Sequence, residues 1–137
     1  MWHALVGVFL VVHGLITTAI GVAAVTNPNA PAMALPAWFS WWPGPFGRSW
    51  LFEALRLGGG FAVVGGLLWL AAGVAIVGGG IGWLGVSALD DAKYALLVGG
   101  ATIGLIALAL YFHPLYVAAI LINVALVALL WVRLAAS

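Results

Sequence analysis

The sequence has very little charge and no cysteine. Only four Lys or Arg and three Asp or Glu occur in 137 residues, whereas about a quarter of the residues in a soluble domain are charged. Because so few charges cannot solvate a domain of this size, the composition excludes a water-soluble globular protein. A net charge of +1 also excludes a nucleic-acid binder, which needs a basic patch. The lack of cysteine excludes disulfides, thiolate metal sites and cysteine nucleophiles.

Apolar residues are abundant instead, at 66% of the chain. A bilayer core about 30 Å thick is crossed by about 20 apolar residues in a helix, and four runs meet this length. We predict an all-α, polytopic integral membrane protein with four transmembrane helices in an antiparallel bundle. It forms one membrane domain, 1–137, with helices at about 2–25, 50–77, 92–112 and 115–134.

The predicted connections differ in character. The segment 26–49 holds five of the six prolines and three tryptophans, so we interpret it as a loop lying at one membrane face. The segment 78–91 is rich in glycine and is predicted to be a second loop. His113 and Pro114 form only a turn, so the third and fourth helices are expected to be antiparallel neighbours.

Four spans place both termini and the second loop on the same side of the membrane. Lys93 and Arg133 lie on that side and Arg48 and Arg56 on the other, so the positive-inside count is tied. The free amino terminus and the long first loop favour both termini inside, in a prokaryotic cell membrane. A signal peptide is the alternative for the first run, but that run exceeds a signal's apolar region and no Lys or Arg precedes it, which favours a retained helix.

Small residues recur along the first two helices. Such residues let membrane helices approach closely, and a seven-residue period suits a left-handed seam. We therefore predict helix packing through these residues inside the bundle; the alternative is contact with a second copy or a larger membrane complex. The predicted packing residues are Gly7, Gly14, Gly21, Gly58, Ala62 and Gly66.

Four polar side chains lie at similar predicted depth near the middle of the helices: His13, Thr17, Thr102 and Asn123. Ionisable groups inside a membrane suggest function, so a site for a ligand or a proton is one hypothesis. The alternative is an interhelical hydrogen bond. Haem bound by two histidines is not expected, because His3, His13 and His113 lie at different depths, and no metal-ligand spacing occurs.

A second polar cluster is predicted at the membrane face beneath the first loop: Arg48, Glu53, Arg56 and His113. Glu53 and Arg56 are three residues apart and are expected to pair on one helix face. The hypotheses are interfacial anchoring with a solvated ion pair, or a site for a lipid headgroup or anionic ligand. Asp90, Asp91 and Lys93 are interpreted as charges at a helix start.

The run VGVFLVVHGLITTAIG at 6–21 resembles the first helix of DoxX-like small membrane proteins, which carry a His-Gly pair there. The run LRLGGGFAVVGGLLWLAAGVAIV at 55–77 is similar to their glycine-rich second helix. The resemblance extends to His13-Gly14 and to Glu53 before the second helix. It implies a four-helix membrane component linked to redox systems or quinones.

No nucleophile elbow, P-loop or dinucleotide-binding motif is present in the sequence. We therefore expect a non-catalytic membrane protein that packs as an accessory subunit or homo-oligomer in the lipid bilayer. The first alternative is a binder of a hydrophobic ligand, a quinone or a lipid. The second is an oligomeric transporter or channel, which the lack of a broken helix and of an inverted repeat disfavours.

Overall fold

The computed structural model describes residues 1–39 and 41–136, and every regular element in this part is helical. Short helical elements, η1 (Ala37–Phe39), α2 (Trp50–Ala54) and α4 (Ser87–Asp90), lie in the connections. Four helices of the described chain are long and apolar enough to cross a membrane: α1 (Trp2–Thr26), α3 (Gly59–Trp83), α5 (Lys93–Leu110) and the segment Pro114–Ala135, which comprises η2 (Pro114–Tyr116) and α6 (Val117–Ala135). The prediction of an all-helical chain with four such helices is confirmed.

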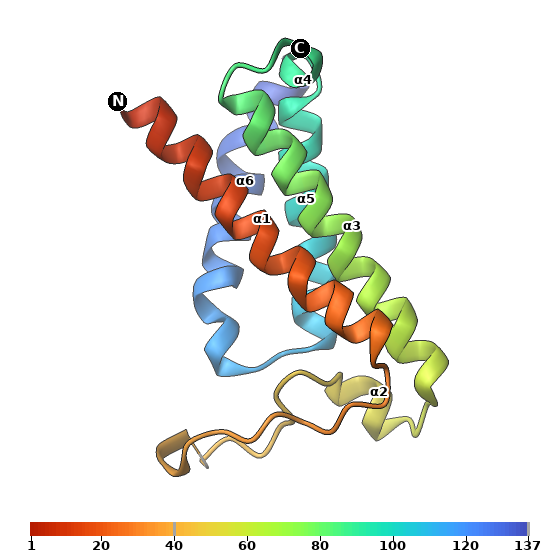
Figure 1. The fold of residues 1–137 in the computed structure, drawn as a ribbon. Helices are drawn as coiled ribbons and strands as arrows, with labels where there is room; N and C mark the ends of the chain where they lie inside the picture. The colour runs from red at the N-terminus through yellow and green to blue at the C-terminus, as the bar shows by residue number, and fades with distance from the viewer. Residues whose placement is uncertain (40, 137) are drawn as a thin grey trace.

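The long helices pack in chain order. Helix α1 packs against α3, α3 against α5, and α5 against α6. Both chain ends and α4 lie at the upper end of the molecule in Figure 1, with the N-terminus to the left, whereas α2 and the long connection after α1 lie at the bottom. The connections are therefore divided between the two ends of the helices, and the long one covers the lower end.

The second helix differs from its predicted bounds of 50–77. It is interrupted after α2, and α3 begins only at Gly59. The backbone of Arg56 has φ of 53°, a left-handed conformation that no α-helix continues. Because Leu55, Arg56 and Leu57 give no proline or turn signal, the apolar pattern alone predicted an unbroken helix.

The other end of α3 extends through the glycines predicted to form a loop, as far as Trp83. Glycine is a poor helix former, but here it permits close packing on both sides. A Cβ atom placed on Gly79 would lie 2.6 Å from Leu97 Cγ, and one on Gly80 would lie 3.0 Å from the backbone nitrogen of Val11. Contacts with α5 and α1 therefore stabilise helix where local propensity favours a loop.

The seam between α1 and α3 consists of small residues at seven-residue spacing. Gly7, Gly14 and Gly21 are buried on α1, and a Cβ atom on Gly14 would lie 2.7 Å from the backbone nitrogen of Val77. On the α3 side, Gly66, Gly73 and Gly80 face α1 in the same way. At these positions the two backbones lie so close that any residue larger than glycine would collide with the neighbouring helix.

Only part of the predicted Gly58, Ala62 and Gly66 series belongs to this seam. Gly66 faces Val25 of α1, whereas no atom lies within 4 Å of a Cβ atom placed on Gly58. Gly58 is the exposed N-cap of α3, and Ala62 lines a cavity described below. The interruption after α2 explains this difference, because it leaves Gly58 outside the helix.

Helix α6 is the least buried of the four long helices. Asn123 is its only buried residue, and large apolar side chains such as Leu121, Leu129 and Val132 are 64%, 73% and 69% exposed. The residue that α6 buries is therefore a polar one, while several of its large aliphatic side chains face outward. This is the reverse of the pattern expected for a helix in water.

Candidate functional site: a cavity beneath the long connection

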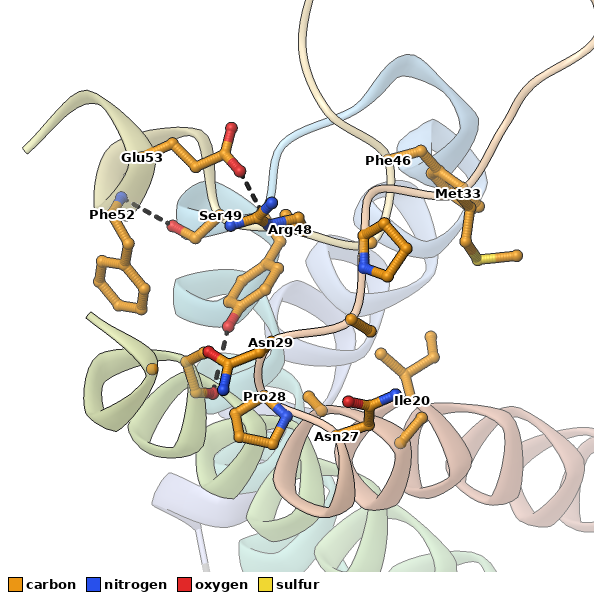
Figure 2. A pocket seen from close by; sticks show the side chains of 18 of the residues that line it. Ile20, Asn27, Pro28, Asn29, Met33, Phe46, Arg48, Ser49, Phe52 and Glu53 are labelled. Carbon is orange, nitrogen blue, oxygen red and sulfur yellow. Dashed lines mark hydrogen bonds and ion pairs between the residues drawn. The ribbon is translucent and has the colours of Figure 1, made fainter. Parts of the chain in front are cut away.

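The candidate site is a cavity at the lower end of the helices with a volume of about 560 Å³. Its walls come from the end of α1, the start of α3, the connection between them, and the turn after α5. Figure 2 shows Ile20, Pro28 and Asn27 on one side and Phe52 with Glu53 on the other. Most of the lining is apolar. Its polar side chains are those of Asn27, Asn29, Arg48, Ser49, Glu53, Tyr111 and Tyr116.

The charged groups in this lining are Arg48 and Glu53, and they pair with each other. Arg48 Nε lies 2.8 Å from Glu53 Oε1, and the two side chains are 45% and 38% exposed. An exposed pair of this kind contributes about 0–1 kcal/mol to stability. Its importance for the cavity is therefore its charge balance rather than its strength.

Ser49 positions this pair. Its hydroxyl accepts a hydrogen bond from the backbone N–H of Phe52 at 3.3 Å, which caps α2, and donates one to the carbonyl of Leu110 at 2.7 Å. The side chain thus starts the helix that carries Glu53 and attaches it to the end of α5. Because the hydroxyl already donates one hydrogen bond and accepts another, Ser49 organises the cavity and has no free donor for a ligand.

Tyr111 supplies a phenol at the inner part of the cavity. The residue is 4% exposed, and its hydroxyl donates a long hydrogen bond of 3.5 Å to the carbonyl of Ala62. The phenol oxygen lies directly against Gly65, where any side chain would displace it. Burial raises the pKa of this phenol, so it remains a neutral hydrogen-bond donor at physiological pH.

His113 holds the connection against the turn between α5 and η2. Its imidazole is fully buried, with ring centroids of Phe39 and Phe46 at 5.2 and 5.1 Å and that of Trp42 at 6.4 Å. Its Nδ1 atom accepts a hydrogen bond from the backbone N–H of Leu115 at 3.2 Å. Phe46 lines the cavity, so His113 supports the cavity from behind without itself lining it.

The predicted membrane-face cluster is therefore only partly assembled. Arg48 and Glu53 meet, but Glu53 pairs with Arg48 instead of the predicted Arg56. Arg56 lies beyond the end of α2 in a left-handed conformation, so the three-residue helical spacing that suggested the pair does not exist. His113 is buried among aromatic rings instead of joining the charged residues.

The predicted mid-membrane group is also brought together in part. The side chains of His13 and Asn123 face each other between α1 and α6, but His13 Nε2 and Asn123 Oδ1 have no hydrogen-bond partner within the described residues. Thr17 is buried, and its hydroxyl donates to the carbonyl of His13 at 2.9 Å. Thr102 is exposed and bonds its own helix at Val98, so it lies apart from the others.

The sequence analysis missed Ser49, Tyr111 and the two asparagines at the end of α1, Asn27 and Asn29. Ser49 precedes an apolar run with an acidic residue four positions later, a weak helix-start signal. Tyr111 ends an apolar run and carried no signal of its own. Asn27 and Asn29 flank a proline, which predicts a turn but no cavity.

The chemistry available in the cavity is that of binding. It combines an apolar volume, the phenols of Tyr111 and Tyr116, the side-chain amides of Asn27 and Asn29, and a balanced pair of charges. Within residues 1–39 and 41–136, no three His, Asp or Glu side chains gather as metal ligands. Comparison of the chain with known protein families, curated proteins and solved structures found no match.

Proposed function

We propose that the chain is an integral membrane protein whose four long helices cross the bilayer as an antiparallel bundle and which binds an amphiphilic hydrophobic ligand. The observation that carries the binding function is the cavity of about 560 Å³. Ligand pockets occupy about 300–1,000 Å³ and combine apolar walls with a few polar groups. This cavity has that size and composition.

The position of the cavity favours a ligand that arrives from the membrane. Four helices have the length and composition of membrane spans, and α6 exposes several large aliphatic side chains. The cavity lies where the helices end and the tryptophan-rich connection begins. In a bilayer, the ends of spanning helices lie near the boundary between head groups and hydrocarbon. An amphiphile can place its polar group at this boundary, with its tail extending into the hydrocarbon beside the helices.

A substitution that fills the cavity tests this function. Ala23 lines the cavity and is exposed on α1, so Ala23→Phe places a ring in the ligand volume. Ala19 is exposed on the same helix outside the lining, so Ala19→Phe is a matched control. Both proteins are extracted in a mild detergent, and their bound small molecules are identified by native mass spectrometry.

We expect the unaltered protein and Ala19→Phe to retain a bound lipid or quinone, and Ala23→Phe to lose most of it. A quinone in the spectrum would support the membrane redox role that the DoxX-like resemblance implies, whereas a glycerolipid would support lipid binding. Equal retention by all three proteins would place the ligand elsewhere. Absence of any bound molecule, together with no binding of added amphiphiles, would overturn the proposed function.

The accessory-subunit, oligomer and transporter hypotheses remain predictions. The glycine stripes that suggested a partner surface lie mainly between α1, α3 and α5 of the same chain. The same native spectra report the number of copies and any companion chain, so they test these hypotheses alongside the ligand.

A further inference from the structure

We infer that the cavity selects an uncharged amphiphile carrying a hydrogen-bond-accepting oxygen, and that it discriminates against an anionic head group. The inference rests on the proposed binding function and deepens it. It follows from the pairing of the two charged side chains of the lining and from the weakly engaged, deeply buried phenol of Tyr111.

The first step concerns charge. Arg48 and Glu53 form a pair at the cavity and cancel each other. An anion drawn toward Arg48 meets the Glu53 carboxylate beside it, because the two groups are in direct contact. Like-charge juxtaposition of this kind is how binding sites exclude the wrong partner. A neutral head group meets no such opposition.

The second step concerns hydrogen bonding. The Tyr111 hydroxyl makes only a long bond of 3.5 Å to Ala62, beyond the usual range of strong O–H···O bonds. A carbonyl, ester or ether oxygen in the cavity would receive a better bond from this phenol. Ser49 already donates to Leu110 and accepts from Phe52. Asn27, Asn29 and Tyr116 also line the cavity, at less buried positions, so Tyr111 is the most deeply buried donor that a ligand in the cavity can reach.

The third step concerns the tail. Apolar side chains of α1, the connection and α2 line the rest of the cavity, among them Ile20, Met33 and Phe52. These surfaces offer an alkyl or isoprenoid chain contact without hydrogen bonding. A neutral glycerolipid and a long-chain quinone share this combination of an apolar tail and acceptor oxygens.

Oleate and methyl oleate separate charge from tail, because the two molecules share one alkyl chain. Binding of each radiolabelled probe to the purified full chain in detergent is measured at about pH 9, where oleate is ionised. We expect methyl oleate to bind at least about tenfold more tightly than oleate. Dioleoylglycerol and decylubiquinone, used as competitors, then distinguish a lipid ligand from a quinone.

Glu53→Gln provides the sharpest variant, because it leaves Arg48 without its counter-charge. We expect oleate to bind about tenfold more tightly to this variant while methyl oleate is little affected. Asp91→Asn makes the same change in net charge at the opposite end of the molecule and controls for the overall field. No change in oleate affinity on Glu53→Gln would overturn the electrostatic part of the inference.

Tyr111→Phe tests the hydrogen bond. Loss of a neutral hydrogen bond should weaken methyl oleate binding by roughly two- to tenfold. Tyr94→Phe is the control and should leave binding unchanged, because Tyr94 packs on Trp83 at the end of α3 and the start of α5 that lie away from the cavity. If oleate binds as tightly as its ester, the inference fails while the proposed function survives. If neither probe nor competitor binds, the proposed function itself fails.

Discussion

His113 is the residue on which the lower end of the molecule depends. Its ring is fully buried between the aromatic side chains of the connection and the turn that begins η2. Because Nδ1 accepts a hydrogen bond from Leu115, the proton of the neutral ring resides on Nε2. Protonation of Nδ1 would remove this bond and place a charge among rings. Burial accordingly lowers the pKa of His113.

This burial predicts a loss of stability in mild acid. An exposed imidazole in the unfolded chain has a pKa of about 6.5, and the folded value lies below it. As the pH falls, the unfolded state therefore takes up the proton first, and stability declines. We expect no contribution above about pH 7.5 and a progressive decline below about pH 6.5. Thermal unfolding in detergent between these limits measures it.

His113→Asn serves as the comparison, because asparagine also caps a helix start but does not titrate. We expect its unfolding temperature to vary less between pH 7.5 and pH 5 than that of the unaltered chain. His3 and His13 remain in both proteins, so the difference between the two slopes belongs to His113. Parallel slopes would contradict the assignment.

At the scale of elements, α3 organises the helices. It presents Gly66, Gly73 and Gly80 to α1. On the adjacent stripe it presents Gly79 to α5 and Gly65 to Tyr111, the residue that follows α5. The glycines within a stripe are seven or fourteen residues apart, a spacing that keeps two helices in contact along a left-handed crossing. In the proposed bilayer, lipid would give the helices no hydrophobic reason to associate, and this close fit would be the main source of attraction between them.

Two glycine-to-alanine substitutions should therefore have opposite effects. A Cβ atom on Gly14 would lie 2.7 Å from the backbone nitrogen of Val77 and 2.9 Å from the carbonyl of Gly73, so Gly14→Ala separates α1 from α3. We expect a loss of about 1–3 kcal/mol, as for overpacked cores. At Gly99 no atom lies within 4 Å of such a Cβ, and Gly99→Ala should gain about 0.5–1 kcal/mol from helix propensity.

Denaturant unfolding in detergent micelles measures both free energies. Both substitutions make the same chemical change in a long apolar helix, so the general effect of alanine on helix stability cancels in the comparison. Stabilisation by Gly14→Ala equal to that by Gly99→Ala would show that the α1–α3 seam is looser than the structure has it.

The elements were predictable from the sequence to the extent that they follow apolar length. The four long helices correspond to four apolar runs, because crossing a bilayer and forming a long apolar helix make the same demand. The break at Arg56 and the helix through Gly79 and Gly80 were not predictable. The first depends on a backbone conformation without a local signal, and the second on packing from α1 and α5.

The site was predictable only in its ingredients. Arg48 and Glu53 were assigned to one membrane face, but their pairing depends on how the connection folds back to Ser49. Tyr111 reaches Ala62 across 49 residues of sequence, a contact that no local pattern encodes. His13 and Asn123 were placed at one depth, which gives their layer but not their partners.

At the scale of the whole molecule, the proposed topology makes the two ends of the helices face opposite sides of the membrane. The chain contains no cysteine, so a single introduced cysteine is a unique label. Ala34 lies in the long connection and Ser87 at the opposite end, at the start of α4, and both are exposed. With both termini inside, Ala34→Cys should react in intact cells with a membrane-impermeant maleimide, and Ser87→Cys only after lysis.

The unaltered chain is the blank for this labelling, because it has no thiol. The reverse pattern would retain the four spans and invert the orientation. Reaction of both variants in intact cells would contradict a membrane crossing by α3.

Construction of the molecule follows an order set by its contacts. Helix pairs form between successive long helices, so each can assemble soon after its second member is synthesised. The cavity depends on contacts between residues far apart in the sequence. Ser49 binds Leu110 across 61 residues, and Phe39 and Phe46 can pack only after His113 has been synthesised. Its enclosure is therefore completed only when the last quarter of the chain emerges from the ribosome. A nascent chain stalled before that point has α1 and α3 but lacks the residues that close the cavity.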